Sequence, residues 1–457
     1  MMRRKIFAAL LWLAALVLPV SAQQSIDQMI DQEIASLVTA YKMLHAAPEL
    51  SGHEEKTAAF VAKELRALGY AVTEGLGKYA TQPWKGHGVV AVMKNGAGPT
   101  LLVRADMDAL PVEEKTGLDY ASKVKTRNTA GQEVSVMHAC GHDIHVATLI
   151  GAARLLARMK DRWQGTLVLI GQPAEEMGSG AKAMLDDGLY TRFPRPDYAI
   201  ALHVGSFEAG KVSYVSGYNM ASVDSVDITV RGIGGHGSRP EAAKDPVVIA
   251  AQVVIALQTI VSRERSPFDP AVVTVGSIHG GTKHNIIPDD VHLQLTVRTY
   301  KKDVRDQIIA SIERIAKGVA ITAGLPEDRM PVVKVSGSGP ATYNDPALTE
   351  RLAQSFRRAL GEENVVKGTA VMGSEDFGLL GLDGKIPTSM FRLGGTDPAE
   401  VRKSMQSGVA LPSNHSPLFA PLPEPTIRTG VKAMTAAVLD LMKKGQARQS
   451  PDPSERE

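Results

Sequence analysis

A thiol, three imidazoles and a carboxylate lie within one short segment in the first third of the chain, where residues 137–145 read MHACGHDIH. Cys140 and His142 are two residues apart, so both side chains can bind one metal ion from a turn, and a bound metal keeps the thiol deprotonated. The alternative is a packed or redox-active thiol. The other polar residues of the segment are weaker candidates, because such residues also favour the start of a helix for capping reasons.

Two adjacent carboxylates form a second candidate group. Glu175 and Glu176 end the sequence QPAEE at residues 172–176, directly after an apolar run at residues 166–170. Neighbouring carboxylates repel each other unless cations are near. Open α/β sheets place their sites at the carboxyl ends of strands, so we expect one carboxylate to bind metal while the other faces a substrate. A solvated acidic loop is the alternative.

Two single histidines are candidates for the remaining metal ligands. His203 follows the apolar run at residues 198–202, so we expect it at the same edge of the sheet as Glu175. His415 lies much further along the chain, in the sequence SNHSP at residues 413–417. Each histidine, considered alone, is weak evidence for a metal site.

Short apolar runs alternate with helical patterns around these residues. Residues 25–70 have helical spacing of apolar side chains, and so do residues 144–159 and 180–187. Strand-like runs occupy residues 87–93, 100–105, 166–170 and 198–202. This alternation predicts an α/β domain with a mainly parallel sheet.

The pattern of elements changes near residue 216. The order predicted there is β-α-β-β-α-β, which is typical of a ferredoxin-like domain. These elements are expected at residues 223–231, 246–261, 271–278, 291–300, 304–323 and 331–335. The α/β pattern then resumes, so we expect a discontinuous larger domain at residues 23–215 and 336–445 with an inserted domain at residues 216–335.

Length, composition and charge narrow the class of protein. A chain of 457 residues exceeds what one hydrophobic core serves, and its 44% of hydrophobic residues can fill two cores. The 51 basic and 49 acidic residues nearly cancel. A nucleic acid is therefore not expected as a partner, because its binders carry a concentrated basic surface.

Residues 1–22 have the pattern of a secretory signal peptide. Basic residues at positions 3–5 precede an apolar run at residues 6–20, and Val-Ser-Ala follows before Gln23. The run is shorter than the roughly 20 apolar residues that a membrane-spanning helix needs. We therefore expect export to the periplasm or medium, with no membrane anchor after cleavage. The polar, charged residues 446–457 are expected to form a disordered tail.

Taken together and in order, these motifs resemble the N-acyl-amino-acid amidohydrolases. This family contains hippurate hydrolase and the plant auxin-conjugate amidohydrolases, and it belongs to the aminoacylase-like dinuclear metallopeptidases. The ordered set of motifs is far more specific than any one of them. The matching stretches are RADMDALP at 104–111, HACGHD at 138–143, QPAEE at 172–176, GHGSRP at 235–240, NIIPD at 285–289, GSEDF at 373–377 and NHSP at 414–417.

The resemblance implies a zinc-peptidase-like catalytic domain that binds two divalent metal ions. The residues that match the family's metal ligands are Cys140, His142, Glu176, His203 and His415, with the cysteine bridging both ions. Cysteine and histidine ligands favour a borderline-soft ion, so zinc is expected first, and manganese, cobalt or nickel could replace it.

The resemblance also implies the reaction and the roles of four further residues. Glu175 matches the general base, which activates a metal-bridged water to hydrolyse the amide bond of an N-acyl amino acid or related small peptide. His236 matches a histidine that reaches into the site of a partner chain, which implies a homodimer formed through the inserted domain as a lid. Asn285, assisted by Arg298, matches the residues that hold the substrate's carboxylate.

Two other functions remain open at the level of the sequence. An exported metallo-dipeptidase or carboxypeptidase would use the same ligands and base on a different substrate. A non-catalytic metal-binding or peptide-binding protein would need no general base, and the presence of Glu175 argues against this class.

Overall fold

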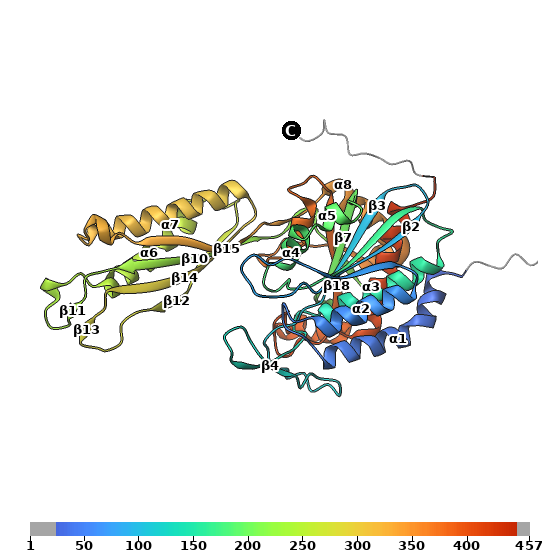
Figure 1. Ribbon diagram of the computed structural model, residues 1–457, viewed down its shortest axis with the longest axis horizontal. Helices are drawn as coiled ribbons and strands as arrows, with labels where there is room; N and C mark the ends of the chain where they lie inside the picture. The colour runs from blue at the N-terminus through green and yellow to red at the C-terminus, as the bar shows by residue number, and fades with distance from the viewer. Residues whose placement is uncertain (1–23, 446–457) are drawn as a thin grey trace, which may run out of the picture.

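The chain folds into two units of different size, as seen in a computed structural model that describes residues 24–445. The smaller unit projects from one side of the larger one, and the first and last described elements, near residues 26 and 441, belong to the larger unit (Figure 1). The predicted signal peptide and the predicted tail lie outside the described residues.

An eight-stranded sheet forms the centre of the larger unit. Its strands are β1 (Ala71–Leu76), β2 (Gly88–Asn95), β3 (Thr100–Asp106), β6 (Gly165–Gln172), β7 (Tyr198–Glu208), β8 (Val212–Tyr214), β17 (Val365–Lys367) and β18 (Thr388–Thr396). Their spatial order is β1-β2-β6-β3-β7-β18-β8-β17, and β6, β3, β7 and β18 run parallel to one another. The expected α/β fold with a mainly parallel sheet is confirmed.

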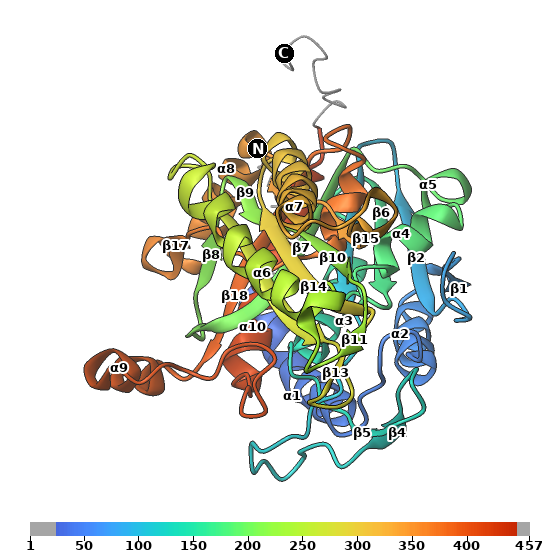
Figure 2. The ribbon, with the colours of Figure 1, turned by 90° about the vertical axis from the view of Figure 1, so that its left-hand side faces the viewer.

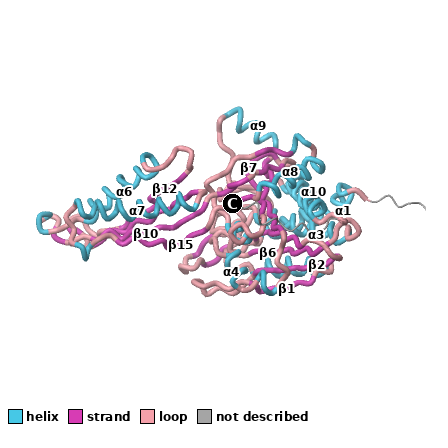
Figure 3. The backbone as a smooth tube through the Cα atoms, turned by 90° about the horizontal axis from the view of Figure 1, so that it is seen from above, coloured by secondary structure: helices cyan, strands magenta, loops and turns pink. Residues whose placement is uncertain are grey.

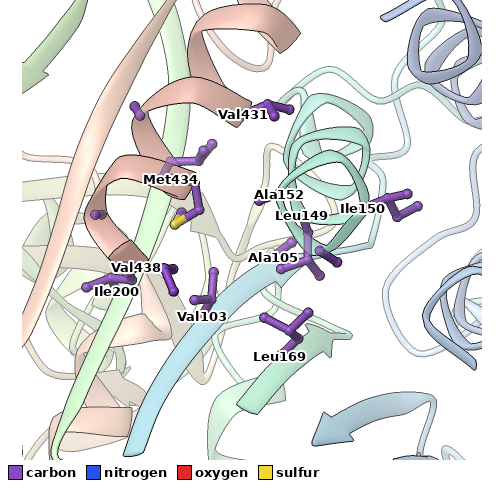
Figure 4. Packing of buried hydrophobic residues seen from close by; sticks show 14 of the residues in the cluster. Val103, Ala105, Leu149, Ile150, Ala152, Leu169, Ile200, Val431, Met434 and Val438 are labelled. Carbon is purple, nitrogen blue, oxygen red and sulfur yellow. The ribbon is translucent and has the colours of Figure 1, made fainter. Parts of the chain in front are cut away.

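Helices cover both faces of this sheet. One face carries α1 (Ile26–Ala46), α2 (Glu55–Ala67), α3 (His142–Arg158), α8 (Pro346–Leu360) and α10 (Pro423–Leu441). The other face carries α4 (Gly180–Asp186), α5 (Leu189–Arg192) and the short 3-10 helix η4 (Asp376–Gly381). Figure 4 shows the first interface, where Met434 and Val438 of α10 and Leu149 of α3 pack over Val103 of β3. This packing fixes the start of α3 relative to the strand ends.

Two elements of the larger unit differ from the sequence-based expectation. Residues 25–70 form two helices instead of one continuous pattern, because Pro48 and Gly52, which has a φ of +78°, lie between α1 and α2. Strand β7 continues to Glu208, past the predicted end at residue 202, because it pairs with β18 as far as Glu208.

The smaller unit contains the predicted β-α-β-β-α-β order. Its elements are β10 (Ser222–Arg231), α6 (Pro246–Arg263), β12 (Ala271–His279), β14 (Asp290–Thr299), α7 (Lys302–Thr322) and β15 (Val332–Gly339). The strands form an antiparallel sheet in the order β12-β14-β10-β15, and both helices lie on one face of it (Figures 1 and 3). Strand β15 continues to Gly339, beyond the expected domain boundary at residue 335, because it remains paired with β10 as far as Val223.

Helix α6 is apolar on more than one face. Among the described residues it is the helix whose length and hydropathy would suffice to cross a membrane, and 33% of that stretch is buried. Its buried residues, such as Val253 and Leu257, pack on the four-stranded sheet. Its outer face leaves Val248 and Ile255 exposed, with Ile255 71% accessible.

The two units are joined by a pair of strands. Strand β9 (Gly217–Met220) leads into the smaller unit, β16 (Thr342–Asn344) leads out of it, and the two pair antiparallel. At the opposite end of the smaller unit, β11 (Gly235–His236) pairs with β13 (Ile286–Ile287) and forms its distal tip (Figure 1).

The remaining elements lie at the margins of the molecule. The hairpin of β4 and β5 and the helix α9 extend outward from the larger unit (Figure 2). The bounds are β4 (Lys125–Arg127), β5 (Glu133–Ser135), α9 (Pro398–Ser407), η1 (Pro240–Ala242), η2 (Glu327–Arg329) and η3 (Glu362–Asn364).

Candidate metal centre

Cys140 and His142 lie where the chain turns into helix α3, and both side chains are buried. Between them Gly141 has a φ of +82°, and a Cβ at this position would lie 2.4 Å from Cγ1 of Val204. Only glycine meets both conditions, because it has no Cβ and adopts positive φ without strain. The glycine therefore lets the turn approach strand β7, which carries His203.

Hydrogen bonds from Nδ1 to backbone oxygens orient the rings of His142 and His203. Nδ1 of His142 lies 2.9 Å from the backbone oxygen of Asp108, and Nδ1 of His203 lies 2.8 Å from that of Val204. A carbonyl oxygen only accepts hydrogen bonds, so in the neutral ring each Nδ1 carries the proton and each Nε2 has a lone pair that can bind a metal ion. Nε2 of His203 lies 3.5 Å from Sγ of Cys140.

Glu176 and His415 approach the same thiol from two other loops. Oε2 of Glu176 lies 3.3 Å from Nε2 of His415. Asn414 anchors the second loop by donating from Nδ2 to the backbone oxygen of Cys140 at 3.1 Å. His415 itself has a φ of +70°, a backbone conformation that is costly for a residue with a side chain. Such strain is typical of functional sites, where the surrounding structure holds the residue in place.

These side chains form two groups that have Cys140 in common, and each group could hold a metal ion. The ligand atoms of Cys140, His142 and His203 lie within 4.8 Å of one another, and so do those of Cys140, Glu176 and His415. Nε2 of His142 and Oε1 of Glu176 are buried without a hydrogen-bond partner among the residues described. Buried polar atoms are normally satisfied, so these two lone pairs point to bound cations.

The electrostatics around the Cys140 thiol also favour a bound metal ion. Burial and the neighbouring carboxylates of Glu176 and Glu175 raise the pKa of the Cys140 thiol well above its ordinary value. The protein groups alone therefore oppose formation of the thiolate. A coordinated cation reverses this effect, because it stabilises the negative charge on sulfur.

Glu175 lies beside the ligand group and is buried, with 8% of its surface exposed. A carboxylate oxygen of Glu175 lies within 4.8 Å of ligand atoms of both His142 and Glu176. Burial, followed by the charges of Glu375 and Glu176, raises the pKa of Glu175 well above its ordinary value. A carboxylate with a raised pKa is a stronger base, which suits a group that takes a proton from water.

A buried arginine stabilises the acidic groups behind Glu175. Nη1 of Arg104 donates to Asp106 at 2.6 Å, and Nη2 donates to Glu375 at 2.8 Å and to Asp376 at 3.3 Å. The guanidinium is fully buried, so these contacts supply the compensation that a buried charge requires. The sequence assigned no role to these residues, although charged side chains at the end of an apolar strand were a visible signal.

Asp108 is a further residue that the sequence did not single out. Its carboxylate lies 3.2 Å from Nδ1 of His142, accepts from the backbone N–H of Glu176 at 3.0 Å and accepts from the hydroxyl of Ser51 at 2.6 Å. One carboxylate thus orients two of the predicted ligands. Partners of this kind orient metal-binding histidines and raise their basicity.

The other polar residues of the 137–145 segment have separate partners. Nε2 of His145 accepts the backbone N–H of Val204 at 2.9 Å, and Nδ1 donates to Asp106 at 2.5 Å. Both nitrogens of His145 are therefore engaged. Asp143 accepts from Nδ1 of His45 at 2.7 Å. His138 is buried, and burial lowers its pKa to about 4, so its ring is neutral.

The three predicted residues of the smaller unit lie in two separate places. His236 and Asn285 lie together at the distal tip, where the backbone N–H of Gly237 donates to the oxygen of Asn285 at 2.9 Å. Arg298 lies near the other end of β14 and donates to Oγ of Ser374 at 3.1 Å. The tip points away from the larger unit (Figure 1), so His236 and Asn285 do not reach the Cys140 group of their own chain.

Comparison with known proteins agrees with this chemistry. The sequence pattern of the Peptidase family M20/M25/M40 matches residues 102–410. Hippurate hydrolase of Campylobacter jejuni is 39% identical over 340 residues, which are 73% of this chain and 82% of that protein. Thermostable carboxypeptidase 1 of Saccharolobus solfataricus is 38% identical over 344 residues, which are 75% of this chain and 81% of that protein.

A solved structure shares the fold over most of both chains. A Bacillus subtilis protein described as a dinuclear metal binding peptidase from the M20 family has a TM-score of 0.70 and 28% identity, and the match covers 90% of this chain and 99% of that one. The resemblance that the motifs indicated is confirmed. The chain belongs to the Peptidase family M20/M25/M40 and is a hydrolase of amide bonds.

Proposed function

We propose that this enzyme hydrolyses the amide bond of N-acyl amino acids and releases a carboxylic acid and an amino acid. The observation that carries the proposal is the position of Cys140, which belongs to two ligand groups at once, with Glu175 directly beside them. A shared thiolate and an adjacent buried base together suit the addition of water to an amide carbonyl. The name of the similar hippurate hydrolase indicates the class of substrate.

In the proposed mechanism the protein's own residues move the protons. Two divalent ions, when bound, would supply Lewis-acid polarisation of the carbonyl and lower the pKa of the attacking water. Glu175 accepts the proton of that water and returns it to the nitrogen of the departing amino acid. The burial of Glu175 excludes bulk water from the proton that it carries. Zinc is the proposed ion, because sulfur and imidazole ligands favour it.

We further propose that His236 acts in the site of a second copy of the chain. Nδ1 of His236 accepts the backbone N–H of Ser238 at 3.1 Å, so in the neutral ring Nε2 carries the proton and can donate to the developing oxyanion. The exposed apolar outer face of α6 and the edge strand β12 offer a surface for a symmetric dimer. Asn285 accompanies His236 and would contact the substrate's carboxylate there, whereas Arg298 approaches it from the same chain.

The experiment that tests the reaction uses purified protein loaded with zinc or manganese. Release of amino acid is measured from benzoyl-glycine, benzoyl-alanine and acetyl-methionine, and in parallel from unblocked dipeptides, with and without chelator. Chelator-sensitive cleavage of the blocked compounds is expected. Cleavage confined to the unblocked dipeptides would contradict the proposal and support the peptidase alternative. The name of the similar thermostable carboxypeptidase is consistent with that alternative.

Export is a separate proposal that rests on residues 1–22 alone. In a host with two membranes, fractionation of cells that express the full-length gene is expected to place the protein in the periplasm, with a mature N-terminus at Gln23. Recovery of uncleaved protein in the cytosol would contradict export.

A further inference from the structure

Two arginines at the junction of the two units have no acidic partner among residues 24–445. Nη2 of Arg392 donates to Oδ1 of Asn219 at 3.1 Å, and Nη1 donates to the backbone oxygen of Thr369 at 3.3 Å. Arg298 donates to Oγ of Ser374 at 3.1 Å and to the backbone oxygen of Met372 at 3.4 Å. All of these acceptors are neutral. Within residues 24–445 neither arginine forms an ion pair with a carboxylate.

This situation differs from that of the buried Arg104, which has three carboxylates around it. Burial lowers the pKa of both Arg392 and Arg298, which means that both charges are partly desolvated without compensation. A partly buried guanidinium presents several donors in a planar fork that matches a carboxylate. Within the described residues no anion fills this role, so an external carboxylate would complete the pair.

Arg392 lies on the strand beside one predicted metal ligand, His203. On strand β18 it is the register partner of His203 on the parallel strand β7. Register partners on neighbouring strands point their side chains to the same face, and the strands lie about 4.8 Å apart. Arg392 thus starts one strand away from His203, on the face that also carries α4 and η4.

Solvent reaches the segment between the two arginines. Thr369, Val371 and Gly373 are exposed, and Met372 and Ser374 are half-buried. Both guanidinium groups hydrogen-bond to this segment, Arg392 at Thr369 and Arg298 at Met372 and Ser374. The two charges lie on different units, Arg298 on β14 and Arg392 on β18, so a dianion would bridge the junction.

We propose that Arg392 is a specificity-determining residue that binds a second carboxylate of the substrate, in addition to the carboxylate that every N-acyl amino acid has. The inference rests on the proposed function and narrows its substrate class to N-acyl amino acids with two carboxylates. The second carboxylate comes from the amino-acid side chain or from a dicarboxylic acyl group, and both sources present the same chemistry to Arg392.

The test compares substrates of equal size that differ in charge. The metal-loaded enzyme is assayed with benzoyl-glutamate against benzoyl-glutamine for the side-chain source, and with succinyl-glycine against succinamoyl-glycine for the acyl source. In at least one pair the charged member is expected to have a roughly 10- to 100-fold higher kcat/KM, because a charged hydrogen bond contributes this much to discrimination. Equal values in both pairs would overturn the inference.

Variants separate recognition from a structural role of the same side chain. Arg392→Gln is expected to lower kcat/KM for the charged member only, and Arg392→Lys to keep part of the preference. The matched control is Arg314→Gln on the exposed surface of α7, which should change neither member. If Arg392→Gln lowers both members of a pair equally, the arginine only holds Asn219 and Thr369, and the inference is wrong.

A binding measurement distinguishes failure of the inference from failure of the proposed function. The same four compounds are titrated calorimetrically into metal-loaded Glu175→Gln protein with Arg392 intact or replaced by Gln. Charge-selective binding that disappears with Arg392 supports the anion site even if none of the compounds is hydrolysed. Binding without charge preference overturns it, whatever the result of the activity assay.

Discussion

At the scale of single residues, the candidate metal centre depends on groups that never touch the metal. The far nitrogen of His142 is held by Asp108, and that of His203 by the backbone oxygen of Val204. Each contact fixes one tautomer and leaves the opposite lone pair directed at Cys140. The precision of the site is therefore set by strands β3 and β7 as much as by the ligands themselves.

Replacement of Asp108 by Ala is expected to weaken metal binding about 10- to 100-fold, because the orientation of His142 and the anchor of the Glu176 backbone are lost together. Competition with a chromogenic chelator measures the affinity. The matched control is Asp306→Ala, an exposed aspartate on α7 that pairs with Lys302. An affinity equal to that of the wild type would show that Asp108 does not orient the ligands.

Replacement of Glu175 by Gln is expected to leave the metal content unchanged and to lower kcat about 10²- to 10⁴-fold, because the amide cannot accept the proton of the attacking water. Elemental analysis and steady-state kinetics on the same sample measure both quantities. Loss of metal together with activity would instead make Glu175 a ligand.

His45 gives a prediction about pH and stability. Burial alone would lower its pKa, but hydrogen bonds to Asp143 and Glu114 raise the pKa to about 10 from the ordinary value of 6.5. A raised folded-state pKa stabilises the fold below pH 6.5, and this stabilisation disappears as the pH rises towards 10. His45→Gln should therefore cost about 3 to 5 kcal/mol at pH 6 and less at pH 10. Chemical denaturation of both proteins across this range measures the difference, and a constant difference would contradict the assignment.

At the scale of elements, most of the site lies on loops between strands and helices, and His203 lies within strand β7. Cys140 precedes α3, Glu175 and Glu176 follow β6, and His415 lies in the loop before α10. Two of these loops contain a residue with a side chain at positive φ, namely Ala174 at +49° and His415 at +70°. Packing of α3 and α10 on the sheet must offset this local strain.

Gly141→Ala tests how closely the ligand turn must approach β7. The new methyl group would meet Val204 at 2.4 Å, in a backbone conformation that also disfavours alanine. Gly69→Ala is the matched control, because Gly69 has a φ of +85° and open space around the Cβ position. The control should cost about 1 to 2 kcal/mol from φ alone, whereas Gly141→Ala should cost more and also lose metal. Equal costs and full metal content in both variants would contradict the role of the close approach.

The sequence predicted the parts of this arrangement that have local signals. Cys140 and His142 stand out by their spacing, and the apolar runs gave the central strands. His203 and His415 carried little information alone and became candidates only through the family resemblance. The roles of Arg104 and Asp108 were missed, because these residues, in β3 and just after it, contact residues that the chain reaches much later. The short strands β8 and β17 were missed because three residues show no periodicity.

At the scale of the whole molecule, the position of His236 at the distal tip separates this histidine from the metal centre of its own chain. Within one chain the proposed base Glu175 belongs to the larger unit, whereas the proposed oxyanion donor His236 lies at the distal tip of the smaller unit (Figure 1). A dimer through the smaller units would bring the tip of each chain to the larger unit of the other. Neither chain would then have a complete site alone.

Mixing of two inactive variants measures this arrangement directly. In a mixed dimer of Glu175→Gln and His236→Ala, one site contains an intact Glu175 from one chain and an intact His236 from the other. After random exchange of subunits we expect about a quarter of the wild-type activity, because half of the dimers are mixed and one of their two sites is complete. Activity no higher than that of the separate variants would contradict a site shared between chains.

Ile255→Asp tests the surface that would join the two copies. This residue is 71% exposed at the centre of the outer face of α6, so a charge there should not disturb the fold of the single chain. In a dimer the charge would be buried, and we expect monomers by analytical ultracentrifugation together with lost turnover. Retained dimers would place the interface elsewhere on the molecule.

The pairing of strands β9 and β16 means that the smaller unit is a single insertion in the larger one. Met220 and Thr342 lie opposite each other in this pair, so the whole intervening segment leaves and returns at one point. A tight turn that joins these two residues would close the pair into an ordinary hairpin and leave every strand of the eight-stranded sheet in place. In evolutionary terms, an ancestor with a single turn at this position could have gained its second unit in one insertion, and a laboratory deletion could reverse that step.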